Sequence, residues 1–257
     1  MNLGFAGSGN MAAAIARGLA RSSRSPELML FADSGSGRAA RLADEVGGEA
    51  VGSLDELAQR SDVVVLAVKP AALIEAAGPL AGRVDGVVSV LGATPVARLR
   101  EAFGETPVLR TMPNLAVEVG HGVICHTAVD PGDAALVEAL EMLGSVARLV
   151  VLDEEHLDAA TAVMGCAPAY LALASEALIE AGIEAGLPAE VSDQLVRDAA
   201  AGLGKHQLER DPADLQRAIA SPGGSTEAGL EALRAAGAPE AFRGAVVASL
   251  DRMSGKA

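Results

Sequence analysis

Residues 2–12 read Asn2-Leu3-Gly4-Phe5-Ala6-Gly7-Ser8-Gly9-Asn10-Met11-Ala12, and they carry the strongest structural signal in the chain. The first five are typical of a short buried strand, and the apolar periodicity of residues 13–20 predicts a helix directly after the turn. The turn itself has the pattern GxGxxA. In this pattern Gly7 makes a tight turn, Gly9 lets a pyrophosphate approach the backbone, and Ala12 lets the helix pack closely on the strand. Because a helix N-terminus attracts negative charge, the sequence predicts a dinucleotide-binding site here.

A second apolar run, Leu28–Ala32, predicts the next strand, and it ends at polar residues. Groups that bind the adenosine ribose usually lie at this position. Ser34, Ser36 and Arg38 could receive a 2′-phosphate, whereas Asp33 would suit a free ribose 2′-hydroxyl. We therefore expect NADP(H) to be the preferred cofactor, with NAD(H) possible.

The first part of the chain alternates apolar strands with helical stretches, a pattern typical of a parallel sheet covered by helices on both faces. We expect a doubly wound, Rossmann-type α/β domain over residues 1–152, assembled by right-handed crossovers. The expected strands are Leu3–Ala6, Leu28–Ala32, Val63–Val68, Val87–Leu91, Val108–Met112, Gly122–His126 and Ala147–Leu152.

From Asp153 onward the strand signals stop, and residues 153–257 predict an all-α domain. Its first helical stretch, residues 154–185, is either one helix of about 30 residues or two helices with a break at Pro168. This stretch is too apolar to be covered by one small lobe, so we expect it to mediate assembly into a homodimer or a higher homo-oligomer. Further breaks are expected at residues 186–188, 211–212, 221–224 and 237–239, with a frayed end at 254–257.

The chain has 257 residues and a formal net charge of -14, which disfavours nucleic acid and anionic membranes as partners. It contains no uninterrupted apolar run of the roughly 18 residues that span a bilayer, and residue 2 already belongs to a strand of the fold. We therefore expect a cytoplasmic protein. Cys125 and Cys166 read as small core residues, and the four histidines have no ligand spacing, so we expect no metal site.

A second distinctive stretch is Ser221-Pro222-Gly223-Gly224-Ser225-Thr226. Pro222 fixes one backbone angle, and the two glycines allow consecutive N–H groups to point at one small ligand. A carboxylate would suit such a set of donors. By itself the loop could equally be a turn between two helices that ends in an N-cap.

Five segments, in order along the chain, resemble motifs of the pyrroline-5-carboxylate reductases. Residues 4–11 are similar to the opening of that family, Leu66-Ala67-Val68-Lys69-Pro70 to its third-strand motif, and Met112-Pro113-Asn114 to its MPN element. The loop at residues 221–226 completes the set. The start of the helical domain contributes Asp158, Thr161, Gly165, Pro168, Ala169 and Tyr170.

The resemblance implies an enzyme that reduces 1-pyrroline-5-carboxylate to L-proline with a reduced nicotinamide, the last step of proline biosynthesis. It implies that Thr226 is the hydroxyl beside the substrate, that Ser221 supports it, and that the loop residues Gly223, Gly224 and Ser225 bind the substrate, with the amides of residues 224–226 holding the carboxylate. Thr226 could also serve as an N-cap. The resemblance further implies that the loop of one chain covers the nicotinamide bound by its partner.

The same resemblance implies the residues that bind the cofactor. Lys69 could alternatively be a plain surface lysine, and Asn114 could position substrate or ribose, or cap a turn. His121 is expected at the rim of the site or in a structural role. The cofactor residues are Ala6, Gly7, Ser8, Gly9, Asn10, Met11, Ser34, Ser36, Arg38, Ala67, Val68, Lys69 and Pro70.

The chain departs from the family pattern at three places: Cys166 and Ala167 replace part of GSGPAY, Leu91 precedes Gly92, and Ser53-Leu54 stand where an Asn is common. A β-hydroxyacid dehydrogenase would share the opening fingerprint but needs a catalytic lysine on the first long helix of its second domain, and no lysine lies between residues 153 and 204. The remaining alternative is a nucleotide-binding protein without catalytic activity.

Overall fold

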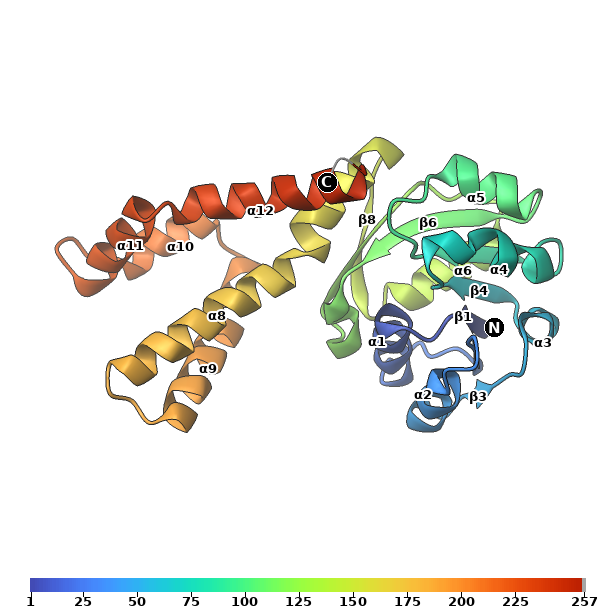
Figure 1. The fold of residues 1–257 in the computed structure, drawn as a ribbon, viewed down its shortest axis with the longest axis horizontal. Coiled ribbons are helices and arrows are strands. Elements are labelled where there is room, and N and C mark those ends of the chain that lie inside the picture. The colour runs from blue at the N-terminus through green and yellow to red at the C-terminus, as the bar shows by residue number, and fades with distance from the viewer. Residues whose placement is uncertain (256–257) are drawn as a thin grey trace. The chain divides into compact units, whose positions relative to one another are not determined.

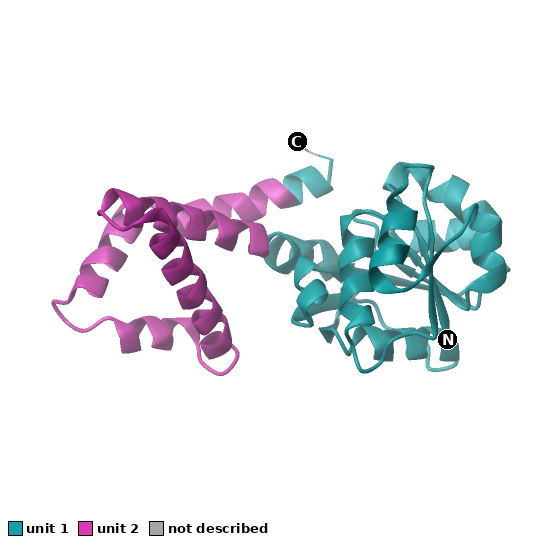
Figure 2. Ribbon diagram, turned by 90° about the horizontal axis from the view of Figure 1, so that it is seen from below, with its two compact units in different colours: residues 1–166, 250–257 teal, residues 167–249 magenta. Residues whose placement is uncertain are grey.

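The computed structural model describes residues 1–255, which form two compact units. The first comprises Met1–Cys166 together with the end of the chain from Leu250, and the second comprises Ala167–Ser249 (Figure 2). The expected domain boundary between residues 152 and 153 falls just after the last strand and stays a prediction.

The first unit is built on one sheet with the strand order β3-β2-β1-β4-β5-β6-β7-β8 (Figure 1). All seven expected strands are present. The sequence missed β3, which has two exposed residues and pairs only with β2, so it carries no apolar signal. The strands are β1 (Asn2–Ala6), β2 (Leu28–Ala32), β3 (Glu49–Ala50), β4 (Val63–Leu66), β5 (Gly86–Ser89), β6 (Val108–Pro113), β7 (Gly122–His126) and β8 (Ala147–Val151).

The prediction of a parallel sheet is wrong at one place, because β6 and β7 pair antiparallel, with Thr111 opposite His126. All the other neighbouring strands pair in parallel. Only residues 114–121 join β6 to β7, and most of them form the short 3₁₀ helix Leu115–Val119. Such a connection is too short for the crossover that two parallel strands require.

Helices cover both faces of the sheet, as the sequence predicts (Figure 1). On one face α1 (Asn10–Ala20), α2 (Arg38–Val46) and α6 (Ala134–Leu143) pack over Phe5 and Phe31, whose rings stack with centroids 5.0 Å apart. The opposite face is covered by α3 (Leu54–Arg60), α4 (Leu73–Leu80) and α5 (Val96–Phe103). Strands buried on both faces explain the continuous apolar runs of β1, β2 and β4.

The stretch after β8 stays helical but changes its hydrogen bonding before Pro168. It passes from a 3₁₀ turn (Glu154–His156) through α7 (Leu157–Ala160) and a π-helical turn (Thr161–Gly165) into α8 (Ala167–Glu184). Because Pro168 has no N–H, it cannot donate to the Met164 carbonyl four residues earlier. The Asn114 side-chain amide donates to that carbonyl instead, at 3.3 Å. The expected break is therefore a local irregularity within a helical run.

Helices are interrupted near every break expected after residue 185, but the second break spans residues 208–211, and residues 212, 238 and 239 already belong to helices. The second unit is entirely helical. Within it, the Ser192 hydroxyl on α9 donates to the Ile179 carbonyl on α8 at 2.8 Å, and the Tyr170 and Ser249 hydroxyls lie 2.6 Å apart. After α8, the helices are α9 (Ala189–Gln207), α10 (Pro212–Ile219), α11 (Ser225–Ala235) and α12 (Ala238–Met253). The predicted frayed end lies partly outside the described residues.

The helices of the second unit do not enclose a core of their own. Among residues 167–249 Leu215 is the one apolar side chain that is buried, whereas Leu173, Leu195 and Val247 are more than half exposed. The helical run Glu154–Glu184 is also long and apolar enough to cross a membrane by length and composition, and only 6% of its most apolar window is buried. Polar and charged residues interrupt this run, so it is not the uninterrupted apolar run that the sequence lacks. In a soluble protein, an exposed apolar helix face of this kind is normally covered by another protein surface.

The two cysteines differ in environment. Cys125 on β7 packs in the core beside Met112 and Leu157, and burial raises the pKa of its thiol. Cys166, expected in the core, follows the π-helical turn and is only partly buried.

Candidate functional site

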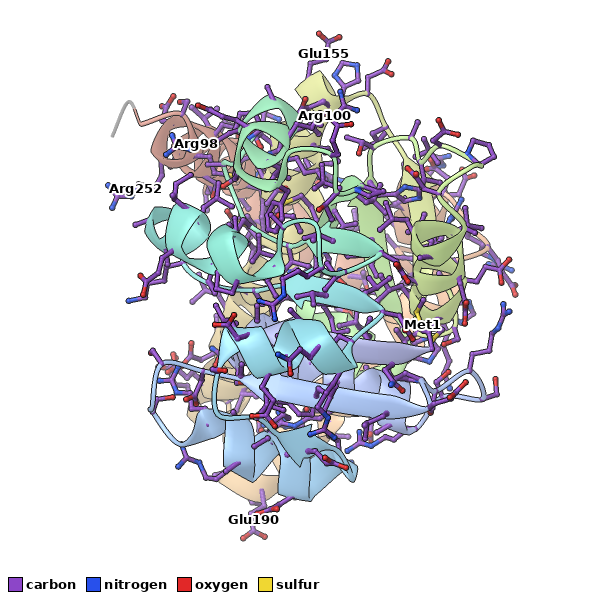
Figure 3. All side chains as sticks on the ribbon, turned by 90° about the vertical axis from the view of Figure 1, so that its right-hand side faces the viewer. Met1, Arg98, Arg100, Glu155, Glu190 and Arg252 are labelled. Atoms are coloured by element: carbon purple, nitrogen blue, oxygen red, sulfur yellow. The ribbon has the colours of Figure 1, made fainter. Side chains whose placement is uncertain are left out.

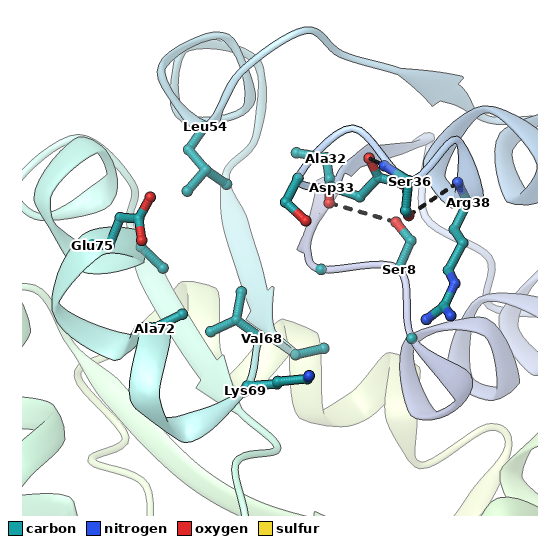
Figure 4. Close-up of a pocket in the computed structure, with 15 residues that line it drawn as sticks. Ser8, Ala32, Asp33, Ser36, Arg38, Leu54, Val68, Lys69, Ala72 and Glu75 are labelled. Carbon is teal, nitrogen blue, oxygen red and sulfur yellow. Dashed lines mark hydrogen bonds between the residues drawn. The ribbon is translucent and has the colours of Figure 1, made fainter.

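A cleft of about 660 Å³ opens at the carboxyl ends of β1, β2 and β4 (Figure 4). The strand order reverses between β1 and β4, and open α/β sheets bind ligands outside the strand ends at this position. Three loops, following β1, β2 and β4, supply most of the lining. The residues that line it are Gly7, Ser8, Gly9, Ala32, Asp33, Ser34, Ser36, Arg38, Leu54, Ala67, Val68, Lys69, Ala72, Glu75 and Ala76.

Gly7 is the tight point of the first loop. Its φ of +97° lies in the left-handed region, and a Cβ built there would lie 2.6 Å from the Ala67 carbonyl oxygen. Its own N–H donates to the Ala32 carbonyl at 2.9 Å. No other residue fits this position, because a side chain would strain the backbone and clash with the loop after β4.

Gly9 differs from Gly7, because a Cβ built on it would meet no protein atom within 4 Å, so packing within the protein does not require a glycine there. Gly9 precedes the first helical residue of α1, and no side chain caps that helix. The N-terminal amides of α1 therefore adjoin open space that a larger residue would fill. A pyrophosphate group fits this cradle, since helix N-terminal amides favour negative charge.

Asp33, at the end of β2, is fully engaged by its own loop. Its Oδ1 accepts from the Gly35 N–H at 2.7 Å, and its Oδ2 accepts from the Ser36 hydroxyl at 2.8 Å and the Ala39 N–H at 2.9 Å. Desolvation acts to raise the pKa of this carboxyl, but hydrogen bonds from backbone amides and from Ser36 outweigh it and lower the pKa to about 2. Asp33 thus organises the loop that presents Ser34, Ser36 and Arg38 to the cleft.

Two cations line the cleft without an ion-pair partner among residues 1–255. Arg38 begins α2, and Lys69 precedes the 3₁₀ turn Pro70–Ala72. Both are exposed. In Figure 4 the Lys69 and Arg38 side chains approach the space below Ser8 from opposite sides. These charges suit an anionic ligand, although the chain as a whole is acidic.

The structure brings nine of the thirteen expected cofactor residues together in the cleft lining. The other four lie beside it: Ala6 is buried in the sheet, Asn10 and Met11 form the first turn of α1, and Pro70 begins the turn after Lys69. The sequence reasoning did not name Leu54, Ala72, Glu75 or Ala76 as site residues. Two sequence features could have pointed to them. Leu54 follows Ser53, which caps α3, and Ala72 and Ala76 are four residues apart, a spacing that places both on one helix face.

Asn114 is 8% exposed, and both ends of its side chain bind the protein. Its Oδ1 accepts from the Val123 N–H at 3.0 Å, and its Nδ2 donates to the Met164 carbonyl. Asn114 is also the N-cap residue of the 3₁₀ helix that follows: its backbone carbonyl accepts from the Val117 N–H at 3.2 Å, while its side chain makes no capping bond. Its role toward substrate stays a prediction. His121 is exposed at the loop before β7.

The loop of residues 221–226 connects α10 and α11. The Gly224 N–H donates to the Ser221 carbonyl at 2.9 Å, and the Gly223 N–H donates to the Glu227 carboxylate at 2.6 Å. Gly224 is the N-cap of α11, so Thr226 is the second helical residue and not its cap. The N–H groups of Ser225 and Thr226 have no helical carbonyl partner, and both residues are exposed.

Comparisons with known proteins match both parts of the chain. The family model for pyrroline-5-carboxylate reductase dimerisation matches residues 154–255, and a model for coenzyme F420-dependent NADP oxidoreductases matches residues 2–92. The pyrroline-5-carboxylate reductase of Corynebacterium melassecola is 32% identical over 96% of this chain and 95% of its own. The enzyme of Pseudomonas aeruginosa is 35% identical, over 91% of this chain and 89% of its own. This chain belongs to the pyrroline-5-carboxylate reductase family.

Solved structures agree with this assignment. A pyrroline carboxylate reductase from Plasmodium falciparum, solved with NADP bound, has a TM-score of 0.87 and 27% identity, covering 100% of this chain and 98% of that one. A 1-pyrroline-5-carboxylate reductase from Streptococcus pyogenes has a TM-score of 0.86 and 26% identity, covering 98% of each chain. The predicted family and the Rossmann-type domain followed by a helical domain are confirmed.

Proposed function

We propose that this reductase converts 1-pyrroline-5-carboxylate to L-proline with NADPH as the reductant. The observation that carries the proposal is a match to pyrroline-5-carboxylate reductases along nearly the whole chain. The cleft at the carboxyl ends of β1, β2 and β4 agrees with it, because its glycine turn and unpaired cations suit a dinucleotide. A chain of this kind is an oxidoreductase acting on a C=N bond.

The reaction requires orientation more than strong acid or base groups. A reduced nicotinamide held in this cleft would supply the hydride for the imine carbon of a substrate protonated as an iminium, and the C=N π electrons would then remain on the nitrogen, which keeps its proton. The protein must hold the ring at the correct distance and angle, which can contribute several kcal/mol, about 7 or more in well-oriented systems. A hydroxyl beside the ring nitrogen can stabilise or deliver its proton.

For the cofactor, we propose that Gly7, Ser8 and Gly9 hold the pyrophosphate with the first turn of α1, and that Ala67, Val68 and Lys69 lie along the nicotinamide half. The preference for NADPH follows from Asp33. Its carboxylate already accepts four hydrogen bonds from its own loop, so it is poorly placed to accept a ribose 2′-hydroxyl as well. NADH remains usable, since a 2′-hydroxyl meets no steric barrier in an exposed loop.

For the substrate, we propose that the N–H groups of Ser225 and Thr226 hold the carboxylate at the N-terminus of α11, where the helix dipole favours negative charge. The Thr226 hydroxyl acts at the ring nitrogen, and the Ser221 hydroxyl supports it. Gly223 and Gly224 shape the loop rather than donate, because their own N–H groups are engaged by Glu227 and Ser221. Asn114 contributes by holding the backbone around Met164 and Val123 in place.

We propose a homodimer in which the helical unit of one chain associates with that of its partner. The exposed apolar residues of α8 and α9 support this, since residues 167–249 bury almost no apolar side chain within one chain. Buried in a dimer, these faces would supply a core that neither chain has alone. We further propose that the loop at residues 221–226 serves the partner's nicotinamide, and that the enzyme works in the cytoplasm.

The direct test is a spectrophotometric assay of purified protein with NADPH and 1-pyrroline-5-carboxylate. Oxidation of NADPH that requires the imine, with L-proline identified as the product by mass spectrometry, is the expected result. Absence of proline formation, in a sample shown to be folded and to bind NADPH, would contradict the proposed reaction.

A further inference from the structure

A second cavity adjoins the cofactor cleft. It is a recess of about 270 Å³ between α1 and α2, and we call it the arginine recess. It shares Ser8 and Arg38 with the cleft, so the two spaces meet at these residues. The residues that line the arginine recess are Ser8, Ala13, Arg17, Arg38, Arg41, Leu42 and Glu45.

Three guanidinium groups and one carboxylate line the recess, so its lining is net positive. Arg17 is already paired. Its Nε and Nη2 donate to the Glu45 carboxylate at 2.7 and 2.9 Å, and its Nη1 donates to Glu118 at 3.3 Å. Arg38 and Arg41 have no carboxylate partner within residues 1–255. In a chain with a net charge of -14, two unpaired guanidiniums at one cavity indicate a local site for an anion.

Arg41 lies beside Gly37, the N-cap residue of α2. Arg38 and Arg41 are three residues apart on α2 and therefore share one face of the helix. Gly37 has a φ of +70°, and a Cβ built on it would lie 3.4 Å from Arg41 Nη1. The Arg41 guanidinium therefore lies beside the loop that carries Ser36, and it lines the arginine recess together with Ser8 and Arg38, the two residues that the recess shares with the cleft.

We infer that Arg41 is a second arginine for the 2′-phosphate of NADPH and a determinant of cofactor specificity. This inference rests on the proposed NADPH site and adds to it a residue that the sequence pattern did not single out. A 2′-phosphate extends from the ribose over the end of β2, toward Ser36 and Arg38. Guanidinium groups bind phosphate oxygens through charge-assisted, often paired hydrogen bonds, and two of them approaching from one helix would clamp the group.

Calorimetric titrations test the role of Arg41 in nucleotide binding independently of catalytic activity. Adenosine 2′,5′-bisphosphate, adenosine 5′-monophosphate and inorganic phosphate would each be titrated into the unmodified protein and into Arg41→Ala and Arg41→Lys. The matched control is Arg98→Ala, an exposed arginine on α5 that lines neither cavity and has no ion pair among the described residues (Figure 3). Thermal unfolding would show that each variant is folded.

Arg41→Ala is expected to weaken the binding of adenosine 2′,5′-bisphosphate about tenfold and to change the binding of adenosine 5′-monophosphate hardly at all. Arg41→Lys should have an intermediate effect, because it keeps the charge but loses the paired hydrogen-bond geometry. Arg41→Ala should likewise raise the dissociation constant of NADPH and leave that of NADH nearly unchanged. Arg98→Ala should change neither constant. Equal losses for both nucleotides, no loss for either, or an Arg41 effect confined to free phosphate would overturn the inference. If the bisphosphate result holds while no proline is formed, the proposed reaction fails and the role of Arg41 stands.

Discussion

Arg110 is 3% exposed on β6, and its Nη2 donates to Asp158 Oδ1 at 2.7 Å. Its Nη1 donates to Glu154 Oε1 at 3.1 Å, and the same carboxylate oxygen accepts from the Val96 N–H at 2.6 Å. A buried cation therefore fixes the first helical turns after β8 against the sheet. Together with the bond from Asn114 to Met164, it attaches the start of the helical run to the strand that ends at the MPN element.

Removing this cation should destabilise the fold. Arg110→Ala is expected to lower the free energy of unfolding by about 2 kcal/mol, because it removes a buried pair and leaves a cavity, while the two carboxylates can still be hydrated. Arg110→Met should cost less, since methionine refills part of the volume. Urea denaturation measures both. Equal stability of Arg110→Ala and the unmodified protein would show that the network is dispensable.

The hydrogen bonds to Asp33 predict a dependence of stability on pH. The pKa of Asp33 falls from its ordinary value of 3.8 to about 2 in the folded state, so its contribution is complete above about pH 4 and is lost as the pH falls toward 2. Asp33→Asn should therefore lower the Tm at neutral pH, and the difference should shrink between pH 4 and 2. Asp44→Asn, which changes an exposed carboxylate on α2, is the control. A difference in Tm that does not change with pH would contradict this account.

Thr226→Ala should slow turnover strongly and leave the affinity for NADPH unchanged, because its hydroxyl is proposed to act on the substrate. Loss of a preorganised hydrogen bond raises a barrier by about 2 to 4 kcal/mol, or roughly 30- to 1000-fold in kcat. Thr226→Ser, which keeps a hydroxyl, should retain most of the activity. Steady-state kinetics and NADPH titration separate the two effects, and wild-type turnover in Thr226→Ala would remove the proposed role.

Arg38→Ala should change cofactor choice. If Ser34, Ser36 and Arg38 bind the 2′-phosphate, the variant should lose about tenfold or more in kcat/KM with NADPH and little with NADH. The kinetics with NADH are the control for the kinetics with NADPH, since a general disturbance of the loop would lower kcat/KM with both cofactors. Equal losses would favour an enzyme that uses NADH.

Mixing two inactive variants tests whether the active site is shared between subunits. Thr226→Ala disables the loop, and Gly9→Asp places a carboxylate in the open cradle for the pyrophosphate, where a side chain meets no protein atom within 4 Å. In a mixed dimer with shared sites, one site carries both defects and the other carries neither. Random exchange should then restore about a quarter of the activity. No recovery, despite exchange proven by mass spectrometry, would mean that each chain completes its own site.

Local patterns predicted the elements that have a strong local signal. The apolar runs of β1, β2 and β4 are buried on both faces, so they are visible in the sequence as continuous stretches. Proline or glycine lies at most of the breaks between helices from residue 186 onward, although α9 ends at Gln207 with neither. By contrast, β3 has only two exposed residues, and the direction of β7 depends on the length of a loop rather than on composition. Neither feature leaves a periodic signal.

The site shows the same division. The glycine turn and the residues after β2 and β4 were predicted because their motifs demand particular residue types, such as a glycine at φ +97°. Leu54, Ala72 and Glu75 carry no such demand and join the lining only because α3 and α4 pack beside the strand ends. The engagement of Asp33 by its own loop was equally invisible, since the same aspartate could have pointed into the cleft.

The sequence by itself determined the two-part architecture, the family and the dinucleotide motif, because each depends on residues that are close together along the chain. Only the tertiary structure decided which carboxylates and cations remain free to meet a ligand. Arg17 and Arg41 are alike in the sequence, yet Arg17 is neutralised by Glu45 and Glu118 while Arg41 is left open beside Gly37. Pairing depends on distances across α1, α2 and the turn before β7, and such distances exist only once the chain has folded.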